Sequence, residues 1–307
     1  LERSNQVELS LLDAEDQLVK HRMIRIYVSE TPPNLKNIVT DVINKKVSQF
    51  PFMLINGATF NPMAVDANGD IRYSLQLRTN RMGMIPLQNG HVLFADRTAN
   101  CVNRLGEIQP CRYHEMDYMG RVYRTFILKD PISTVITQYE NSLYLVTSSD
   151  KEHINDCIIE LDMNSGEIVK NCDLGQVLGE KYRDTRDWTM LSCLEYHQGS
   201  LLITLKRLHT VMNLRWEDGS VEWLLAPEGI WEDTPLHSRC LRQQEGEALR
   251  LGRPDSAVWE DDSQISVFNT QVRGDIPAGY SCEDKSSVVT VAIEAEKGTY
   301  YQTEEIS

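Results

Sequence analysis

Cationic side chains flank the strongly apolar stretch at residues 187–205, and they are the residues of this chain best suited to hold an anion. Arg186 directly precedes this stretch, while Lys206 and Arg207 directly follow it. A guanidinium offers sulfate, phosphate or carboxylate oxygens a planar fork of N–H donors, whereas an ammonium acts as a point charge. These residues predict a pocket for a small anion. Salt bridges with the chain's many acids are the alternative interpretation.

Two histidines are candidates for nucleophilic chemistry, because a neutral imidazole is a good nucleophile near pH 7. His209 follows Lys206 by three residues, and His237 lies in the loop sequence EDTPLHSRC. Side chains alternate between the two faces of a strand, so His209 is expected on the face opposite to Lys206. An ordinary surface or packing position is the alternative for both histidines.

Other catalytic patterns are missing from the sequence. No cluster of histidine, cysteine or carboxylate has metal-ligand spacing, and there is no Gly-rich phosphate loop or Gly-x-Ser-x-Gly elbow. The sequence therefore predicts neither a metal nor a cofactor.

The stretch that carries these cations, RDWTMLSCLEYHQGSLLITLKRLHTV (186–211), predicts a β-hairpin. Two apolar runs flank the turn sequence HQG (197–199). Asp187 and Trp188 at its start are expected to be structural, with the carboxylate capping a turn and the indole packing between sheets.

The same hairpin recurs along the chain from about residue 52 onward, and each copy is followed by a second hairpin with a turn of the type D-x-x-G-x-I/V. The first hairpins are MGMIPLQNGHVLFAD (82–96), TVITQYENSLYLVTS (134–148), 190–206 and SAVWEDDSQISVFNT (256–270). The second hairpins are VDANGDIRYSL (65–75), VNRLGEIQPC (102–111), LDMNSGEIVKNC (161–172), LRWEDGSVEWLL (214–225) and, more loosely, IEAEKGTYYQT (293–303).

A four-stranded antiparallel unit repeated every ~40–60 residues is the blade of a β-propeller. We expect about six blades, the last one completed by N-terminal strands or incomplete. A β-sandwich is the alternative.

The N-terminus has a different texture. In VELSLLDAEDQLVKHRMI (7–24), five apolar residues fall near one helical stripe: Val7, Leu11, Leu12, Leu18 and Val19. LKNIVTDVINKKV (35–47) suits either a helix or a strand. We therefore expect a helical or extended segment over residues 1–50 and an all-β propeller over residues 51–307.

Composition limits the classes of partner. The chain has 307 residues with a formal net charge of −14, and 41% of its residues are hydrophobic, which is typical of a folded protein. The acidic balance disfavours nucleic acid and anionic membranes, and no apolar run approaches the roughly 20 residues that cross a bilayer. A homodimer is left open.

Seven cysteines, an odd and scattered number, make a poor disulfide framework. They favour a reducing compartment and hence the cytoplasm. Export stays open, because the start LERSNQVELS has no apolar leader but a leader could have been removed.

The run DLGQVLGEKYRDTRDWTMLSCLEYHQGSLLITLKRLHTVMNLRWEDGSVEWLLAPEGIW (173–231) resembles the core of bacterial arylsulfate sulfotransferases. The cues are an Asp-Trp before a strand pair, then a D-G-x-V-x-W-x-L hairpin and a Pro-Glu-Gly-x-Trp stretch. The flanking runs PLQNGHVLFAD, IIELDMNSGEIVKNCDL and SVFNTQVRGD (266–275) agree. The resemblance covers most of residues 55–300, in order.

The resemblance implies a propeller with a small N-terminal domain that moves a sulfuryl group between phenols without a nucleotide cofactor. It also implies that the expected partner is a small aromatic or sulfated ligand. In that family a histidine becomes transiently sulfated, while other histidines and arginines hold the sulfate oxygens. Here the family's nucleophile position holds Met190, and its following asparagine is Ser192. The arginine that the family has at the end of the next strand corresponds to Lys206 here, and a later family histidine corresponds to Asp255. An earlier His-Asp pair of the family corresponds to positions near residues 133–134, which hold neither residue type.

These departures leave three hypotheses. The first is a family member with a degenerate catalytic set that binds a small anionic or phenolic ligand at the propeller axis, through Lys206, Arg186, Met190, Ser192 and Asp255. The second is an active sulfotransferase whose nucleophile is relocated to His209 or His237. The third is a propeller that serves as a protein-interaction platform, which predicts an exposed apolar patch and no pocket.

Overall fold

The structure is a computed structural model. It describes residues 3–28, 30, 35, 52–55, 62–75, 84–102, 108–128, 132–133, 135–150, 152–244, 249, 251–270 and 286–306. The chain divides into two compact units, residues 1–77 and residues 78–307. No helix among the described residues is long and apolar enough to cross a membrane.

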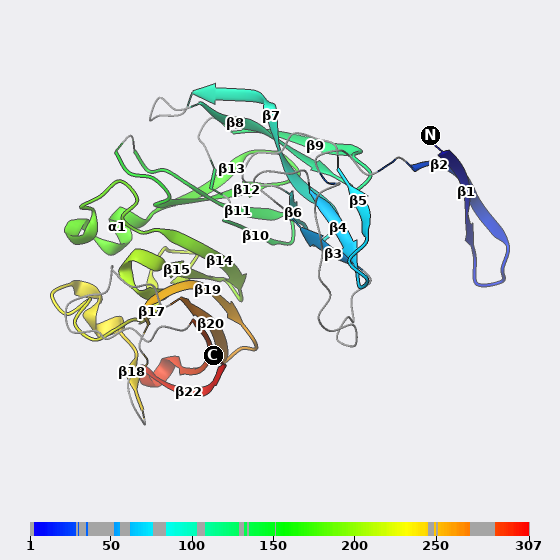
Figure 1. Cartoon of the computed structure of the whole chain (residues 1–307). Helices are drawn as coiled ribbons and strands as arrows, with labels where there is room; N and C mark the ends of the chain where they lie inside the picture. Colours follow the sequence, from blue (N-terminus) through cyan, green and yellow to red (C-terminus); the bar gives the residue numbers. More distant parts are fainter. Residues whose placement is uncertain are drawn as a thin grey trace. The chain divides into compact units, whose positions relative to one another are not determined.

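The first unit contains a hairpin and a small sheet (Figure 1). The hairpin pairs β1 (Arg3–Leu12) with β2 (Leu18–Val28) in antiparallel fashion. The sheet has the antiparallel order β3 (Phe52–Ile55), β4 (Met63–Asp66) and β5 (Ile71–Ser74).

The helix expected over residues 7–24 is wrong, since this segment forms most of the β1–β2 hairpin. Apolar residues alternate with polar ones along VELSLL, which is the period of a strand. The acidic run between the two segments forms the turn: the Asp13 carboxylate accepts hydrogen bonds from the backbone N–H groups of Glu15 and Gln17, both at 2.9 Å. Asp16 adopts a left-handed conformation, with φ of 58°. Asp residues form such turns readily, so here they end a strand and do not form the polar face of a helix.

Residues 36–51 lie outside the described residues, and so do most of the predicted element 35–47 and the predicted boundary at residues 50–51. Both stay predictions.

The second unit is built from four successive sheets, whose strands pair in antiparallel fashion except for β18 and β22 in the fourth (Figure 1). The first has β6 (Met84–Pro86), β7 (Val92–Val102), β8 (Ile108–Met116) and β9 (Val122–Ile127). The second has β10 (Ile136–Tyr139), β11 (Ser142–Thr147), β12 (Cys157–Asp162) and β13 (Ile168–Asp173). The third has β14 (Leu191–His197), β15 (Ser200–Leu205), β16 (Thr210–Arg215) and β17 (Val221–Leu225). The fourth has the order β18 (Arg242–Gln243), β22 (Thr299–Ile306), β21 (Ser287–Glu294), β20 (Gln264–Thr270) and β19 (Arg253–Trp259).

Short helices lie in the connections. They are α1 (Leu174–Leu178), η1 (Glu180–Tyr182), η2 (Lys206–Leu208), η3 (Pro235–Arg239) and η4 (Ala295–Lys297).

One apolar cluster lies between each pair of neighbouring sheets of this unit. Residues of β7 and β8 pack with residues of β11 and β12, residues of β11 and β12 with residues of β15 and β16, and residues of β15–β17 with residues of β19–β21. β15 shows why its sequence, SLLITL, is a continuous apolar run. Leu201 and Ile203 belong to the cluster on one face, while Leu202 belongs to the cluster on the other. A strand buried on both faces needs apolar residues at successive positions.

The predicted fold class is confirmed. The structure is all-β with very little helix, and its repeated antiparallel sheets are arranged as propeller blades. One three-stranded sheet lies in the first unit and four larger sheets lie in the second, so the described residues account for five blades.

Ile203→Ala should lower the free energy of unfolding by about 2–5 kcal/mol, because the side chain is fully buried and its removal leaves a cavity. Ile127→Ala is the matched control, since that side chain is 71% exposed and its loss should change stability little. Urea unfolding followed by tryptophan fluorescence measures both. Equal losses in the two variants would contradict this packing.

Candidate functional site

A pocket of about 180 Å³ lies at the end of β15, where the chain turns into β16. Met190, Lys206, Arg207, His209 and Arg253 line it. Met190 comes from the loop before β14, the next three residues from the β15–β16 turn, and Arg253 from the start of β19 in the neighbouring sheet. Four of the residues singled out in the sequence (Met190, Lys206, Arg207 and His209) are therefore brought together with one further arginine, Arg253.

The turn between β15 and β16 is a 3₁₀ turn, η2, that ends at His209 in a left-handed conformation with φ of 50°. Strand alternation therefore does not apply after residue 205, and the expectation that His209 faces away from Lys206 is wrong. The imidazole is buried, and its Nδ1 is hydrogen bonded to the backbone carbonyl of Gly252. A carbonyl only accepts, so Nδ1 carries the proton, and Nε2 holds the lone pair of the neutral ring.

Met190 also has a left-handed backbone, with φ of 43°. Its carbonyl accepts a hydrogen bond from the Lys206 N–H at 3.3 Å, and the Thr189 carbonyl accepts one from the Arg207 N–H at 3.3 Å. Left-handed non-glycine residues cost about 1–3 kcal/mol each and gather at functional sites. Two of them, Met190 and His209, line this one pocket.

The pocket is rich in positive charge. Lys206 forms an ion pair with Asp255 on β19, and Arg207 lies 3.8 Å from the carboxylate of Asp184. Arg253 donates to the thioether sulfur of Met190 at 3.5 Å. Three cationic side chains therefore line one pocket of a chain whose formal net charge is −14.

Ser192 lies at a bulge in β14, where the pairing with β15 shifts register between Leu191 and Cys193. Its buried hydroxyl has no hydrogen-bond partner among the described residues. The Asp255 carboxylate, across the seam between the two sheets, contributes to the raised pKa of the Cys193 thiol, although burial is the largest cause. The Ser192 hydroxyl and the Asp255 carboxylate therefore add polar groups to the seam between these two sheets.

Four predicted residues do not line the pocket: Ser192 and Asp255, which lie beside it, and Arg186 and His237. Arg186 is exposed, and its backbone carbonyl accepts a hydrogen bond from Ile154 N–H at 2.8 Å. His237 lies on η3 and lines two other cavities.

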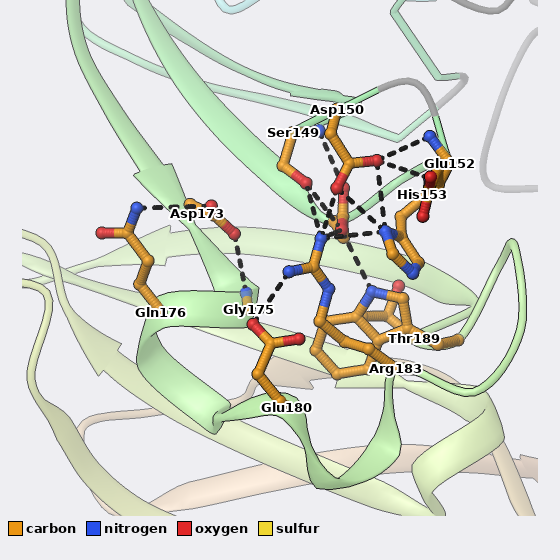
Figure 2. Close-up of polar contacts among 12 residues, drawn as sticks. Ser149, Asp150, Glu152, His153, Asp173, Gly175, Gln176, Glu180, Arg183 and Thr189 are labelled. Atoms are coloured by element: carbon orange, nitrogen blue, oxygen red, sulfur yellow. Dashed lines mark hydrogen bonds and ion pairs between the residues drawn. The ribbon is translucent and has the colours of Figure 1, made fainter.

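A second polar cluster, which the sequence did not reveal, clamps the loop that carries Met190 (Figure 2). The Arg183 guanidinium points between the carboxylates of Asp150 and Glu180, at 2.6 and 3.0 Å. The fully buried carboxylate of Asp156 accepts hydrogen bonds from the Trp188 indole at 3.0 Å and from the Ser149 hydroxyl at 2.9 Å. Trp188 is thus held by a hydrogen bond as well as by packing.

The neighbouring contacts complete this clamp. The Thr189 hydroxyl donates to the Asn155 carbonyl at 2.9 Å, and the Asn155 amide donates to the Asp187 carboxylate at 3.3 Å. Burial raises the pKa of Asp187, and the nearby Asp156 charge adds to this effect. The loop at residues 149–156 therefore fixes residues 183–189, and with them the start of β14.

These features define a β-propeller with a small cationic pocket at the end of a blade hairpin. The family model described as arylsulfotransferase (ASST) matches residues 37–307. The chain therefore belongs to the arylsulfotransferase family. No curated protein matches it at a significant level of sequence similarity.

Similar solved structures are distant in sequence. A chain of the mitotic checkpoint complex aligns at 7% identity and a TM-score of 0.47, covering 83% of this chain and 61% of that chain. KlHsv2 with one loop replaced by a Gly-Ser linker aligns at 8% identity and a TM-score of 0.46, covering 98% and 78%. The Neurospora crassa Pan2 WD40 domain aligns at 9% identity and a TM-score of 0.45, covering 84% and 63%.

The clamp predicts a pH dependence of stability. Partial burial raises the pKa of Asp150, but hydrogen bonds from His153 and Glu152 outweigh this and bring it down to about 2. A carboxyl whose pKa is depressed in the folded state stabilises it above the unfolded value of about 3.9, and this contribution is lost as the pH falls towards the folded value.

The difference in unfolding free energy between the wild type and Asp150→Asn should therefore be largest above about pH 4 and should shrink towards pH 2. Urea titrations at several pH values measure it. A difference that does not change with pH would show that the Asp150 carboxylate has the same pKa in the folded and unfolded states.

Proposed function

We propose that the pocket at the end of β15 binds the sulfate group of an aryl sulfate ester or a related phenolic anion. The observation that carries this proposal is the convergence of Lys206, Arg207 and Arg253 on one pocket of an acidic protein. Arginine binds sulfate oxygens with its planar fork, and lysine adds a point charge. Typical ligand sites measure ~300–1,000 Å³, so a pocket of about 180 Å³ suits the sulfate group with its aromatic ring near the mouth.

Binding without transfer is the function that the residue types favour. Met190 stands where the resemblance places the nucleophilic histidine, and its thioether neither relays a proton nor accepts a sulfuryl group usefully. Met190 instead contacts Arg253 through its sulfur, so it helps to orient a cation.

A second candidate function, sulfuryl transfer, is favoured by the position of His209. Its Nε2 lone pair would attack sulfur, the S–O bond to the aryl group would break, and the phenolate would leave with the electron pair. The oxygen of an acceptor phenol would then attack the same sulfur, the N–S bond would break with its electron pair returning to Nε2, and the phenol's proton would be released to solvent as the new ester forms. The Nδ1 hydrogen bond to Gly252 would hold the ring in the required tautomer.

Lys206→Met should weaken the binding of 4-nitrophenyl sulfate at least tenfold, or about 1.4 kcal/mol. The variant removes the ammonium and also leaves the Asp255 carboxylate unpaired beside the anion. Lys181→Met is the matched control, because this half-exposed lysine lies on η1 and does not line the pocket. Titration calorimetry measures both. Unchanged affinity in Lys206→Met would refute the proposed anion site.

Turnover of 4-nitrophenyl sulfate with phenol as acceptor distinguishes the two functions. The binding function predicts no nitrophenolate release above background from the wild type. If release occurs, His209→Asn should abolish it, because asparagine tolerates the left-handed backbone and can still donate to the Gly252 carbonyl but has no imidazole. Turnover that survives in this variant would exclude His209 as the nucleophile.

A further inference from the structure

A short segment of the chain joins the outer edges of the last two sheets. The Leu241 N–H donates to the Leu224 carbonyl of β17 at 2.8 Å, and the Arg242 N–H donates to the Gly298 carbonyl at 3.0 Å. Residues 242–243 form β18, which pairs in parallel with β22 (Figure 1). Edge strands offer unpaired backbone groups, and here one segment satisfies both edges. This fixes the Leu241 side chain inward and the Arg242 side chain outward.

Two adjoining cavities, each of about 480 Å³, lie along this segment. Both are lined by His237, Cys240, Leu241 and Arg242, so they adjoin the same segment, and together they are called the edge groove here. Each cavity is within the size range of small-molecule sites. Neither shares a lining residue with the pocket at the end of β15.

One end of the edge groove is basic. Arg239, Arg242 and Lys297 line it. Lys297 pairs with Glu294 at 3.0 Å, whereas Arg239 and Arg242 are exposed and make no ion pair with any carboxylate of the described residues.

The carboxylates at this end do not cancel the arginines. Glu222 is held by Arg215 at 2.9 Å and also accepts hydrogen bonds from Ser200 and Asn213. Glu296, the other acid of this cavity, is a single exposed charge against two arginines. The end therefore has excess positive charge, which is unusual on a chain with a formal net charge of −14.

The other end of the groove has mainly apolar walls. Pro227, Trp231, Leu241, Leu249 and Tyr300 are all buried side chains there, and the exposed carboxylates of Glu228 and Glu232 also line this cavity. An aromatic ring or short hydrocarbon chain inserted against the apolar walls would lose contact with water, which is favourable.

We infer that the edge groove is a second ligand site, which binds an organic anion with one acidic group and an apolar body. The acidic group lies against Arg239 and Arg242, and the body enters the apolar cavity. The charge and the apolar walls lie side by side because one strand segment presents both Arg242 and Leu241 to the two cavities, while Arg239 lines only the basic one. This inference is independent of the function proposed for the pocket at the end of β15.

Calorimetric titration of the full chain with 8-anilinonaphthalene-1-sulfonate tests the inference. The wild type should bind the probe at a saturable site, and the double variant Arg239→Gln/Arg242→Gln should bind it at least tenfold more weakly. Ala226→Phe, which fills the apolar cavity from its half-exposed wall, should also weaken binding. Arg121→Gln removes an exposed arginine from another sheet and is the matched control. Circular dichroism melts check that each variant is folded.

The outcomes are distinct. Loss in both groove variants with full binding in the control supports the site. Unchanged affinity in the double variant overturns it, even if the probe binds elsewhere. Loss in Lys206→Met with retention in the double variant places the probe in the pocket at the end of β15 and also overturns it. Inorganic sulfate should compete weakly, because it lacks the apolar body; equal competition would refute the role of the apolar cavity.

Discussion

The ion pair between Lys206 and Asp255 is the contact on which the geometry of the pocket depends. It joins the β15–β16 turn of one blade to β19 of the next, beside the apolar cluster that packs between these two sheets. Arg253 precedes Asp255 by two residues on β19, so the same contact sets the distance between the two blades' cations. A lysine ammonium has three donors and Asp255 uses one of them, so donors remain for a ligand. The pair therefore holds the Lys206 ammonium in place and leaves some of its N–H donors for a ligand.

Other parts of the structure hold this seam in place. The clamp of Arg183, Asp150 and Asp156 fixes Trp188, and the loop after it reaches the pocket with Met190 in a left-handed conformation. A left-handed methionine opposite a left-handed histidine is unfavourable in isolation, and the clamp and the Gly252 hydrogen bond compensate for it. Apolar packing between neighbouring blades makes the fold rigid, while polar contacts at the strand ends determine which side chains come together. Fold and site thus depend on different kinds of interaction.

Much of the propeller can be predicted from sequence because strand length, alternation and turn residues are local signals. The run SLLITL and the turn at residues 197–199 illustrate this. The N-terminal hairpin was missed although VELSLL alternates apolar and polar residues, because DAED suited the polar face of a helix; Asp13 instead accepts two backbone hydrogen bonds in a turn. His209 was misplaced because the turn that redirects it contains no glycine. Arg253 was missed because β19 has a bulge at Asp255, so two-residue alternation does not connect the two residues.

The central claim is that the cations of two blades hold a sulfate group between them. The most direct test is a crystal structure of the protein soaked with 4-nitrophenyl sulfate, with the anomalous signal of sulfur locating the ligand. The account predicts sulfate oxygens within hydrogen-bond distance of the Lys206 ammonium and the Arg253 guanidinium. A pocket that stays empty at saturating ligand, or ligand bound in the edge groove alone, would contradict it.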